Sequence, residues 1–207
     1  MLTTAQLGRA IAAIDARIAA IRDELNAADR HLGDGDTGMT VAQVVAGWSA
    51  VAADLPADVG AALLALGRET SRSTGSSLGS VFAMALSAAG RAVRGREDLS
   101  RGDIVAALAA ATKTVAERSG AAPGDKCVLD SLMSIERQLA LAGDDADLLA
   151  QAQAAAHASL LEFRARESRL GRARMYGARS IGHDDPGMLA VVLLLAQVQA
   201  AADGAPG

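Results

Sequence analysis

The chain has 207 residues, of which 51% are hydrophobic and only 2% are aromatic. This length suits one compact domain, so we expect residues 1–207 to fold as a single unit. A core with so few aromatic side chains must be built from Ala, Leu, Val and Ile, which favours closely packed helices. The formal net charge of -4 argues against nucleic acid as a partner, because binding to a phosphate backbone needs a basic face.

The sequence also bears on the cellular compartment. Cys127 is the only cysteine, so a disulfide framework is excluded and a reducing cytosol is the expected environment. The first twenty residues carry Arg9, Asp15 and Arg17 within their apolar pattern, which differs from the continuous apolar segment of a signal peptide. The longest apolar run, residues 188–196, is far shorter than the roughly 20 residues needed to cross a bilayer. We therefore expect a cytoplasmic protein without a membrane partner.

Apolar residues recur at three- and four-residue steps along most of the chain, which predicts helices and no strands. The first helix, residues 4–28, carries its apolar stripe at Ile11, Ile14, Ile18, Ile21 and Leu25. Seven more helices are expected around residues 38–53, 57–71, 81–94, 104–115, 129–139, 146–167 and 188–202, with a turn at residues 143–145 before the seventh. The prediction is therefore an all-α fold of eight helices.

The composition of the connections indicates where a functional site lies. Consecutive helices joined by short loops pack antiparallel, so the first, third, fifth and seventh connections lie at one end of the bundle. These four connections hold the stretches rich in Gly, Ser, Asp and Pro, and each one directly precedes a helix: residues 29–40, 71–79, 123–126 and 184–187. Because helix N-termini favour anions, the sequence predicts a single functional rim.

The first of these connections is strongly acidic. Asp29, Asp34 and Asp36 fall within eight positions and are interleaved with glycines that allow tight bends. Crowded carboxylates repel one another, and an all-oxygen set of ligands favours Mg²⁺ or Ca²⁺. Thr37 or Thr40 is expected to cap the next helix, whose free N–H groups attract phosphate. The plain alternative is a Gly/Asp turn between two helices.

The other connections allow two interpretations each. Residues 73–79 are either a flexible turn with a helix cap or a cradle of amides and hydroxyls for a phosphate. Lys126 is either a surface cation or a point charge on a phosphate. Six arginines lie between residues 164 and 179; several are expected to be solvated, with one or two closing over a nucleotide. His31 neighbours the acidic loop, and His183 directly precedes the Asp-Asp-Pro-Gly turn.

Taken together and in order, these loops resemble a known family, the nucleotide-binding L subunit of dihydroxyacetone (glycerone) kinases. The resemblance spans residues 29–187 and therefore most of the chain. The stretches that carry it are Ala28-Asp29 with residues 33–36, residues 75–77, residues 123–126 with Asp130, residues 171–173 with 177–183, and residues 185–187.

The resemblance implies an eight-helix antiparallel barrel with a nucleotide, ADP or ATP, and two Mg²⁺ ions at one end. It implies that Asp29, Asp34 and Asp36 are the metal ligands and that Arg172 offsets charge on the transferring phosphoryl group. It also implies nucleotide contacts at Thr37, Gly38, Met39, Thr40, Ser76, Ser77, Gly120, Val128, Arg172, Asp185, Pro186 and Gly187. In that family a histidine of a separate K subunit holds the substrate covalently, so the chain is expected to need such a partner.

The sequence departs from the family pattern at a few positions. Thr37 stands where the family usually has His, as in the related fatty-acid-kinase domains, and Met39-Thr40 replaces an aliphatic-Asn pair. Leu78 takes a common glycine position and Val128 replaces a common Met. The three aspartates are unchanged, so the departures concern substrate and partner more than nucleotide binding.

The function expected from the sequence is Mg²⁺-dependent phosphoryl transfer to a short hydroxyketone presented by a K-like subunit. Two phosphate donors stay open: exchangeable ATP, or a phosphotransferase-system protein that rephosphorylates bound ADP. A homodimer stays open as an oligomeric state. The two rival interpretations are a fatty-acid-kinase-like domain, which Thr37 favours, and a regulatory module that binds nucleotide only to signal to a partner.

Overall fold

The computed structural model of the protein describes residues 1–143 and 146–203. The turn expected at residues 143–145 falls partly on 144–145, and the expected single domain extends over 204–207; both stretches lie outside the described residues. Within the described ranges the elements are, in order, β1 (Leu2–Thr3), α1 (Thr4–Asp15), α2 (Ile18–Leu32), α3 (Thr37–Val51), η1 (Ala52–Asp54), α4 (Val59–Ser73), α5 (Ser77–Ala92), β2 (Asp98–Leu99), α6 (Arg101–Arg118), α7 (Val128–Leu141), α8 (Leu148–Arg164), η2 (Arg172–Ser180) and α9 (Pro186–Ala202).

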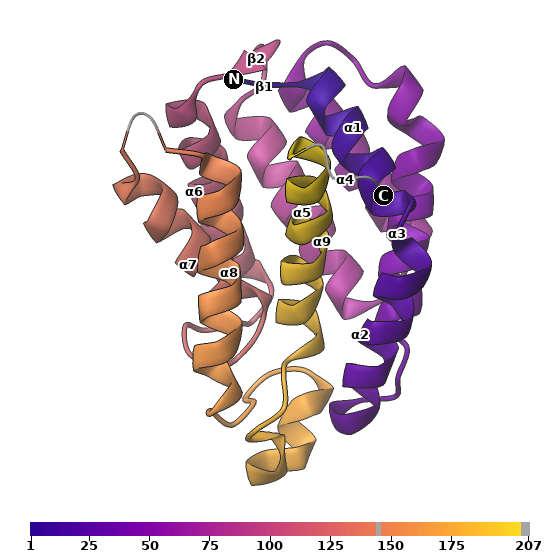
Figure 1. The fold of residues 1–207 in the computed structure, drawn as a ribbon, viewed down its shortest axis with the longest axis vertical. Helices are drawn as coiled ribbons and strands as arrows, with labels where there is room; N and C mark the ends of the chain where they lie inside the picture. Colours follow the sequence, from indigo (N-terminus) through magenta and orange to yellow (C-terminus); the bar gives the residue numbers. More distant parts are fainter. Residues whose placement is uncertain (144–145, 204–207) are drawn as a thin grey trace.

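The helices form a closed antiparallel barrel (Figure 1). From α2 onward each α-helix packs against the next one along the chain, and α9 contacts α1 and α2, which closes the ring. The largest core cluster joins α1, α2, α3, α7, α8 and α9 through aliphatic side chains such as Leu25, Val41 and Met188, all fully buried. The all-α barrel expected from the sequence is confirmed.

The first predicted helix is in fact two helices. At Arg17 the backbone leaves the helical region, with φ of -115° and ψ of 6°, and no glycine or proline marks the break. Both halves still bury the predicted stripe, Ile11 and Ile14 from α1 and Ile21 and Leu25 from α2. Because α1 and α2 each contact both α3 and α9, the bend keeps both halves against the curved wall of the barrel.

A minimal sheet lies at the end of the barrel where the N-terminus begins (Figure 1). Leu2 pairs with Leu99 and Thr3 with Asp98 in antiparallel register. The prediction of no strands was therefore wrong here, because two residues are too short for any alternation to be visible in the sequence. Among the described residues, no helix combines the length and apolar character needed to span a bilayer.

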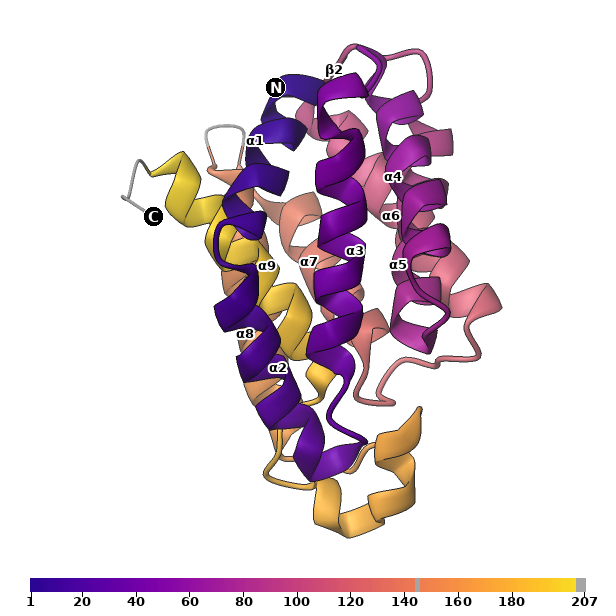
Figure 2. The same ribbon diagram turned by 90° about the vertical axis from the view of Figure 1, so that its right-hand side faces the viewer.

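The opposite end of the barrel carries the long connection between α8 and α9, which contains η2. Figure 2 shows this light orange segment lying beyond the helix ends, next to the connections that follow α2 and α6. This is the rim at which the unusual loop compositions were expected to meet.

Candidate functional site

Four helices begin at this rim, and their N-terminal residues line one cavity of about 650 Å³. α3 contributes Thr37, α5 contributes Ser77, α7 contributes Val128 and α9 contributes Pro186. The first N–H groups of a helix have no partner within it, so four such ends favour an anion in the space between them. The structure thus brings together all four of the predicted loop regions.

The acidic cluster, Asp29, Asp34 and Asp36, lies at the edge of this cavity. One carboxylate oxygen from each residue lies within 4.8 Å of the other two. Asp29 is buried, while Asp34 and Asp36 are exposed. Three negative charges this close repel one another, and a hard divalent cation relieves that repulsion, so the donor set fits Mg²⁺.

Local hydrogen bonds explain why the chain folds this way at the cluster. Asp29 belongs to the last turn of α2, which runs to Leu32 and so beyond its predicted end. Its Oδ2 accepts the N–H groups of Asp36 at 2.9 Å and Thr37 at 3.1 Å, which leaves Oδ1 for a cation. A Cβ at Gly33 would lie 2.2 Å from Asp29 Oδ1, so a larger residue there would displace this carboxylate.

These contacts correct the expected cap of the second helix. Neither Thr37 nor Thr40 caps α3; the helix begins after Asp36, which makes no side-chain cap of its own. The Asp29 carboxylate, from the preceding helix, takes that role. The Asp29 side chain therefore belongs to the acidic cluster and also fixes the start of α3.

The Ser/Gly connection forms the N-terminus of α5. Ser76 caps the helix by accepting the N–H of Gly79 at 3.0 Å, and Thr74 Oγ1 accepts the N–H of Ser76 at 3.2 Å. α5 starts at Ser77, several residues before its predicted start. Both Ser76 and Ser77 line the cavity.

α7 and α9 also begin at the cavity. Asp185 caps α9 by accepting the N–H of Met188 at 2.8 Å, and burial raises the pKa of its carboxyl to about 6. Asp130 fixes the start of α7, because its two oxygens accept the N–H groups of Gly124 at 2.7 Å and Cys127 at 3.0 Å. Burial raises the pKa of the Cys127 thiol to about 12, so it stays neutral.

One arginine of the Arg-rich connection reaches the acidic cluster. Arg172, the first residue of η2, forms an ion pair with Asp34. Tyr176 in the same element donates its hydroxyl to the carbonyl oxygen of Gly33 at 3.4 Å. Arg164 pairs instead with Asp184 and Arg166 with Glu162. The tertiary structure therefore selects Arg172 as the arginine that faces the cavity.

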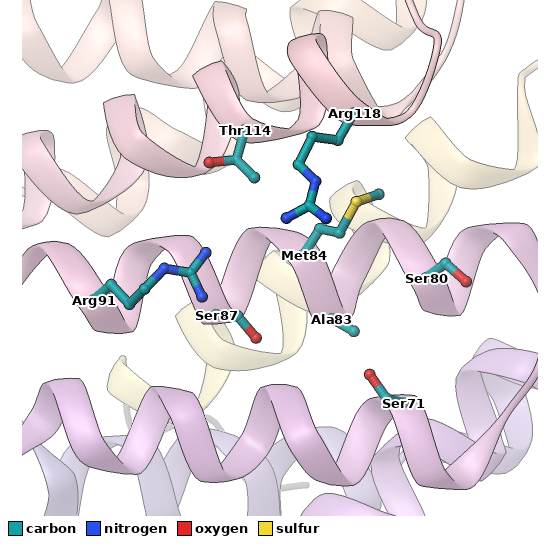
Figure 3. A pocket seen from close by; sticks show the side chains of 8 residues that line it. All are labelled: Ser71, Ser80, Ala83, Met84, Ser87, Arg91, Thr114 and Arg118. Atoms are coloured by element: carbon teal, nitrogen blue, oxygen red, sulfur yellow. The ribbon is translucent and has the colours of Figure 1, made fainter.

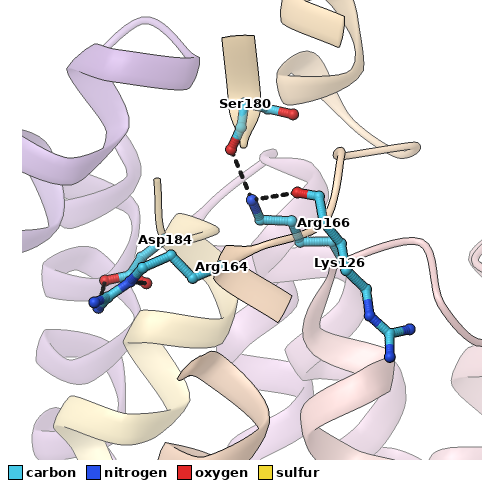
Figure 4. A network of polar contacts seen from close by, with 5 residues as sticks. All are labelled: Lys126, Arg164, Arg166, Ser180 and Asp184. Atoms are coloured by element: carbon cyan, nitrogen blue, oxygen red, sulfur yellow. Dashed lines mark hydrogen bonds and ion pairs between the residues drawn. The ribbon is translucent and has the colours of Figure 1, made fainter. Parts of the chain in front are cut away.

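Lys126 is neither a surface cation nor a cavity-facing charge, so both sequence interpretations were wrong. Its side chain is only 1% exposed, and its Nζ donates to the carbonyl oxygens of Arg166 at 2.9 Å and Ser180 at 2.8 Å (Figure 4).

His31 and His183 stack on each other, with their ring centroids 4.9 Å apart.

Most of the predicted nucleotide contacts line the cavity, and three do not. The residues that do are Thr37, Thr40, Ser76, Ser77, Val128, Arg172, Asp185, Pro186 and Gly187. Gly38, Met39 and Gly120 lie outside its lining; the N–H of Gly38 donates to Asn26 Oδ1 at 2.8 Å. The nucleotide contacts of all twelve residues stay predictions.

The apolar residues that line the cavity were not predicted from the sequence. Leu129 and Leu170 line it together with Met84 and Val115, and Arg118 lies at its edge. Leu129 and Val115 have the periodicity of core residues, which hides any further role. A side groove of about 320 Å³ shares Met84 and Arg118 with the cavity and runs along α5 between α4 and α6 (Figure 3).

Comparisons with a family model and with known proteins agree on the family of this chain. A family model described as the DAK2 domain matches residues 31–200. The ADP-binding subunit DhaL of the PEP-dependent dihydroxyacetone kinase of Escherichia coli (strain K12) is 29% identical over 187 residues, which cover 86% of this chain and 87% of the relative. Triokinase/FMN cyclase of Rattus norvegicus is 30% identical over 188 residues, which cover 87% of this chain and 32% of the relative.

The fold is also found among solved structures. The dihydroxyacetone kinase from C. freundii, in complex with AMP-PNP and Mg²⁺, superposes with a TM-score of 0.74 and 22% sequence identity. The match covers 95% of this chain and 34% of that one. The chain thus spans about a third of the two longer kinases and most of the E. coli subunit.

The fold is a helical barrel that carries a cluster of three aspartates at one rim. The family model matches well over half of the chain, so the chain belongs to the DAK2 domain family.

Proposed function

We propose that this chain is the nucleotide-binding subunit of a hydroxyketone kinase, which transfers a phosphoryl group to a short substrate held on a separate K-like subunit. The observation that carries the proposal is the meeting of three carboxylates within 4.8 Å at the edge of a cavity surrounded by four helix N-termini. Carboxylates for a metal beside amides for phosphates are the parts that phosphoryl transfer needs. The names of the E. coli and rat relatives support this reaction class.

In this proposal, Asp29, Asp34 and Asp36 hold Mg²⁺, two ions as the family resemblance implies, which neutralise charge on the nucleotide phosphates. The N-termini of α3, α5 and α9 bind the phosphate oxygens through backbone amides. Arg172 offsets the charge that develops on the transferring group. The chain then supplies position and electrostatics, and it needs no covalent nucleophile of its own.

The cavity leaves a distinct place for the nucleoside. Leu129, Leu170 and Val128 give the cavity an apolar part, which suits the faces of an adenine ring. The cavity volume of about 650 Å³ lies within the range usual for sites that bind cofactors of this size. We therefore assign ADP or ATP as the ligand.

The proposals for the phosphate donor and the partner are supported by the relative that this chain matches over most of its length. That relative is named as a subunit of a PEP-dependent kinase. By this likeness we propose a K-like partner, with bound ADP that a phosphotransferase-system protein rephosphorylates. Exchange of free ATP is the alternative donor, and the rate at which ADP leaves the purified chain distinguishes the two.

The metal site is tested by the substitution Asp34→Ala. We expect Mg²⁺-dependent ADP binding, measured by titration calorimetry, to become undetectable, while far-UV circular dichroism stays helical. Asp54→Ala is the matched control, because Asp54 is an exposed aspartate in η1, outside the cavity lining. Unchanged ADP affinity in Asp34→Ala would contradict the assignment.

The reaction itself is tested by reconstitution. Purified chain is combined with candidate K subunits, dihydroxyacetone, and either ATP or a phosphotransferase donor system, and phosphate incorporation is followed. Thr37 at the cavity favours one rival, a fatty-acid-kinase-like domain, which predicts phosphorylation of a carboxylate on a lipid-binding protein instead. Tight nucleotide binding without transfer to any partner would favour the regulatory module.

A further inference from the structure

We propose that Lys126 is a positioning residue that holds the segment 166–180 closed at the rim and thereby places Arg172 against the acidic cluster. The inference concerns nucleotide retention, so it rests on the proposed function. It assigns to Lys126 an indirect role, because its ammonium group bonds the backbone of the segment and Lys126 is not among the residues that line the cavity.

The contacts of the ammonium group are unusual. Lys126 Nζ donates to the carbonyl oxygen of Arg166, before η2, and to that of Ser180, the last residue of η2 (Figure 4). Among the described residues no carboxylate forms an ion pair with Lys126. Desolvation by burial lowers the pKa of its ammonium group, and the nearby carboxylates of Asp184 and Asp185 raise this pKa by a smaller amount. A buried charge is costly, so an apolar side chain would serve a purely space-filling role better.

The backbone at Lys126 is held as firmly as its side chain. Among the described residues, Lys126 is the only non-glycine residue with a positive φ, at 62°. Such a conformation persists when surrounding contacts determine it. Asp130 supplies these contacts by bonding the N–H groups of Gly124 and Cys127 on either side. Lys126 is therefore a fixed point attached to the start of α7.

The segment closes on itself but has few other attachments to the barrel. At its base the N–H of Gly182 donates to the carbonyl of Arg164 at 2.8 Å, and Arg164 forms a two-pronged ion pair with Asp184. Within it, Ser180 Oγ accepts the N–H of Ser168 at 2.8 Å. Lys126 joins this closed loop to the start of α7. A backbone hydrogen bond from the N–H of Arg169 to the carbonyl oxygen of the neighbouring Asp125 lies beside it.

The held segment carries the two side chains that reach the acidic loop. Arg172 pairs with Asp34 and Tyr176 bonds the carbonyl of Gly33. Both contacts lie at exposed or half-exposed positions, so water competes with them and they hold the segment weakly. Without Lys126, the segment is expected to move away from the rim and to take Arg172 with it.

The test uses Lys126→Met, with Lys113→Met as the matched control, because Lys113 is the only other lysine and is exposed on α6. Loss of two bonds from a charged donor should speed dissociation of Mg²⁺-ADP by about 10- to 100-fold, measured with a fluorescent ADP analogue in stopped flow. The Mg²⁺ requirement should stay, because the acidic cluster is intact. Lys113→Met should match the parent chain.

A second readout does not depend on nucleotide. Tyr176 is the only tyrosine, so 3-fluorotyrosine labels η2 alone. In the nucleotide-free protein, Lys126→Met should shift or broaden the ¹⁹F signal. A folded Lys126→Met protein with an unchanged ¹⁹F signal and an unchanged ADP dissociation rate would overturn the proposal. If the parent chain binds no ADP, the proposed function fails, and the ¹⁹F comparison still tests the role of Lys126.

The route through Arg172 is tested by a double-mutant cycle. Arg172→Gln and Lys126→Met should be non-additive, so the double variant should release ADP about as fast as the faster single variant. Additive effects of the two substitutions on the ADP dissociation rate would contradict the proposal that Lys126 acts through Arg172. Should Lys126→Met fail to fold, hydrogen exchange of the parent chain decides: the bonded amides of Ser168 and Gly182 should exchange as slowly as helix amides, and fast exchange would contradict a held segment.

Discussion

At the scale of single residues, several side chains at the rim serve two purposes. Asp29 caps α3 with one carboxylate oxygen and presents the other to the acidic cluster. Asp185 caps α9 and lines the cavity. Substitutions by alanine at these positions remove a helix cap and a site residue together. Variants that keep the hydrogen bond are therefore the informative ones.

The Asp185 carboxyl predicts a dependence of stability on pH. Burial raises its folded pKa to about 6, above the ordinary value of 3.8, so the folded chain binds the proton more tightly than the unfolded chain. Its favourable contribution is complete below pH 3.8 and is lost as pH rises through about 6. Between pH 4 and 7 the parent chain should lose about 3 kcal/mol of unfolding free energy relative to Asp185→Asn. Urea denaturation at several pH values measures this, and parallel curves for the two proteins would contradict it.

At the scale of elements, the close contact between α4 and α5 is set by glycines. A Cβ at Gly90 would lie 2.6 Å from the carbonyl oxygen of Gly60 and 2.9 Å from the backbone nitrogen of Leu64. No larger residue fits there without separating the helices. Because α5 also begins at the cavity with Ser77, its distance from α4 affects the position of the Ser/Gly turn.

Gly90→Ala should therefore destabilise the fold by about 1–3 kcal/mol, since overpacking outweighs the gain in helix propensity. Gly8→Ala is the control, because nothing lies within 4 Å of a Cβ built at Gly8 in α1. It should be neutral or stabilising by about 0.5–1 kcal/mol. Denaturant unfolding of both variants measures the difference. Equal stability of the Gly90→Ala and Gly8→Ala variants would contradict close packing of α4 against α5 at Gly90.

Elements were predictable where their signals are local. The eight predicted segments all form helices, because apolar periodicity reflects a buried stripe that each helix presents to the core. The break at Arg17 was not predictable, since the periodic stripe continues through it. The strand pair was also missed, because Leu2 and Leu99 meet only through the closure of the barrel.

At the scale of the whole molecule, the closed ring places the N-termini of α3, α5, α7 and α9 around one cavity. A ligand that bridges them links parts of the chain that are distant in sequence. Binding to the folded state alone stabilises the entire barrel, and the gain depends only on the ligand concentration relative to its dissociation constant.

Mg²⁺-ADP at 100 times its dissociation constant should add about 2.7 kcal/mol to the unfolding free energy. For a domain of this size, that corresponds to a rise in melting temperature of roughly 5–10 °C. Differential scanning fluorimetry or calorimetry measures it. The rise should vanish in EDTA and in Asp34→Ala. A rise in melting temperature of equal size in EDTA would show that the nucleotide binds without Mg²⁺ at the acidic cluster.

The sequence by itself determined the helical segments, the acidic loop and the four connections that share one rim. These follow from periodicity and from the backbone freedom of glycine, which are properties of short stretches. Only the tertiary structure showed that Arg172 forms an ion pair with Asp34 and that Lys126 is buried. Its partners Arg166 and Ser180 lie 40 and 54 positions away in the sequence. Contacts across such separations depend on how the barrel closes, and no local pattern encodes that.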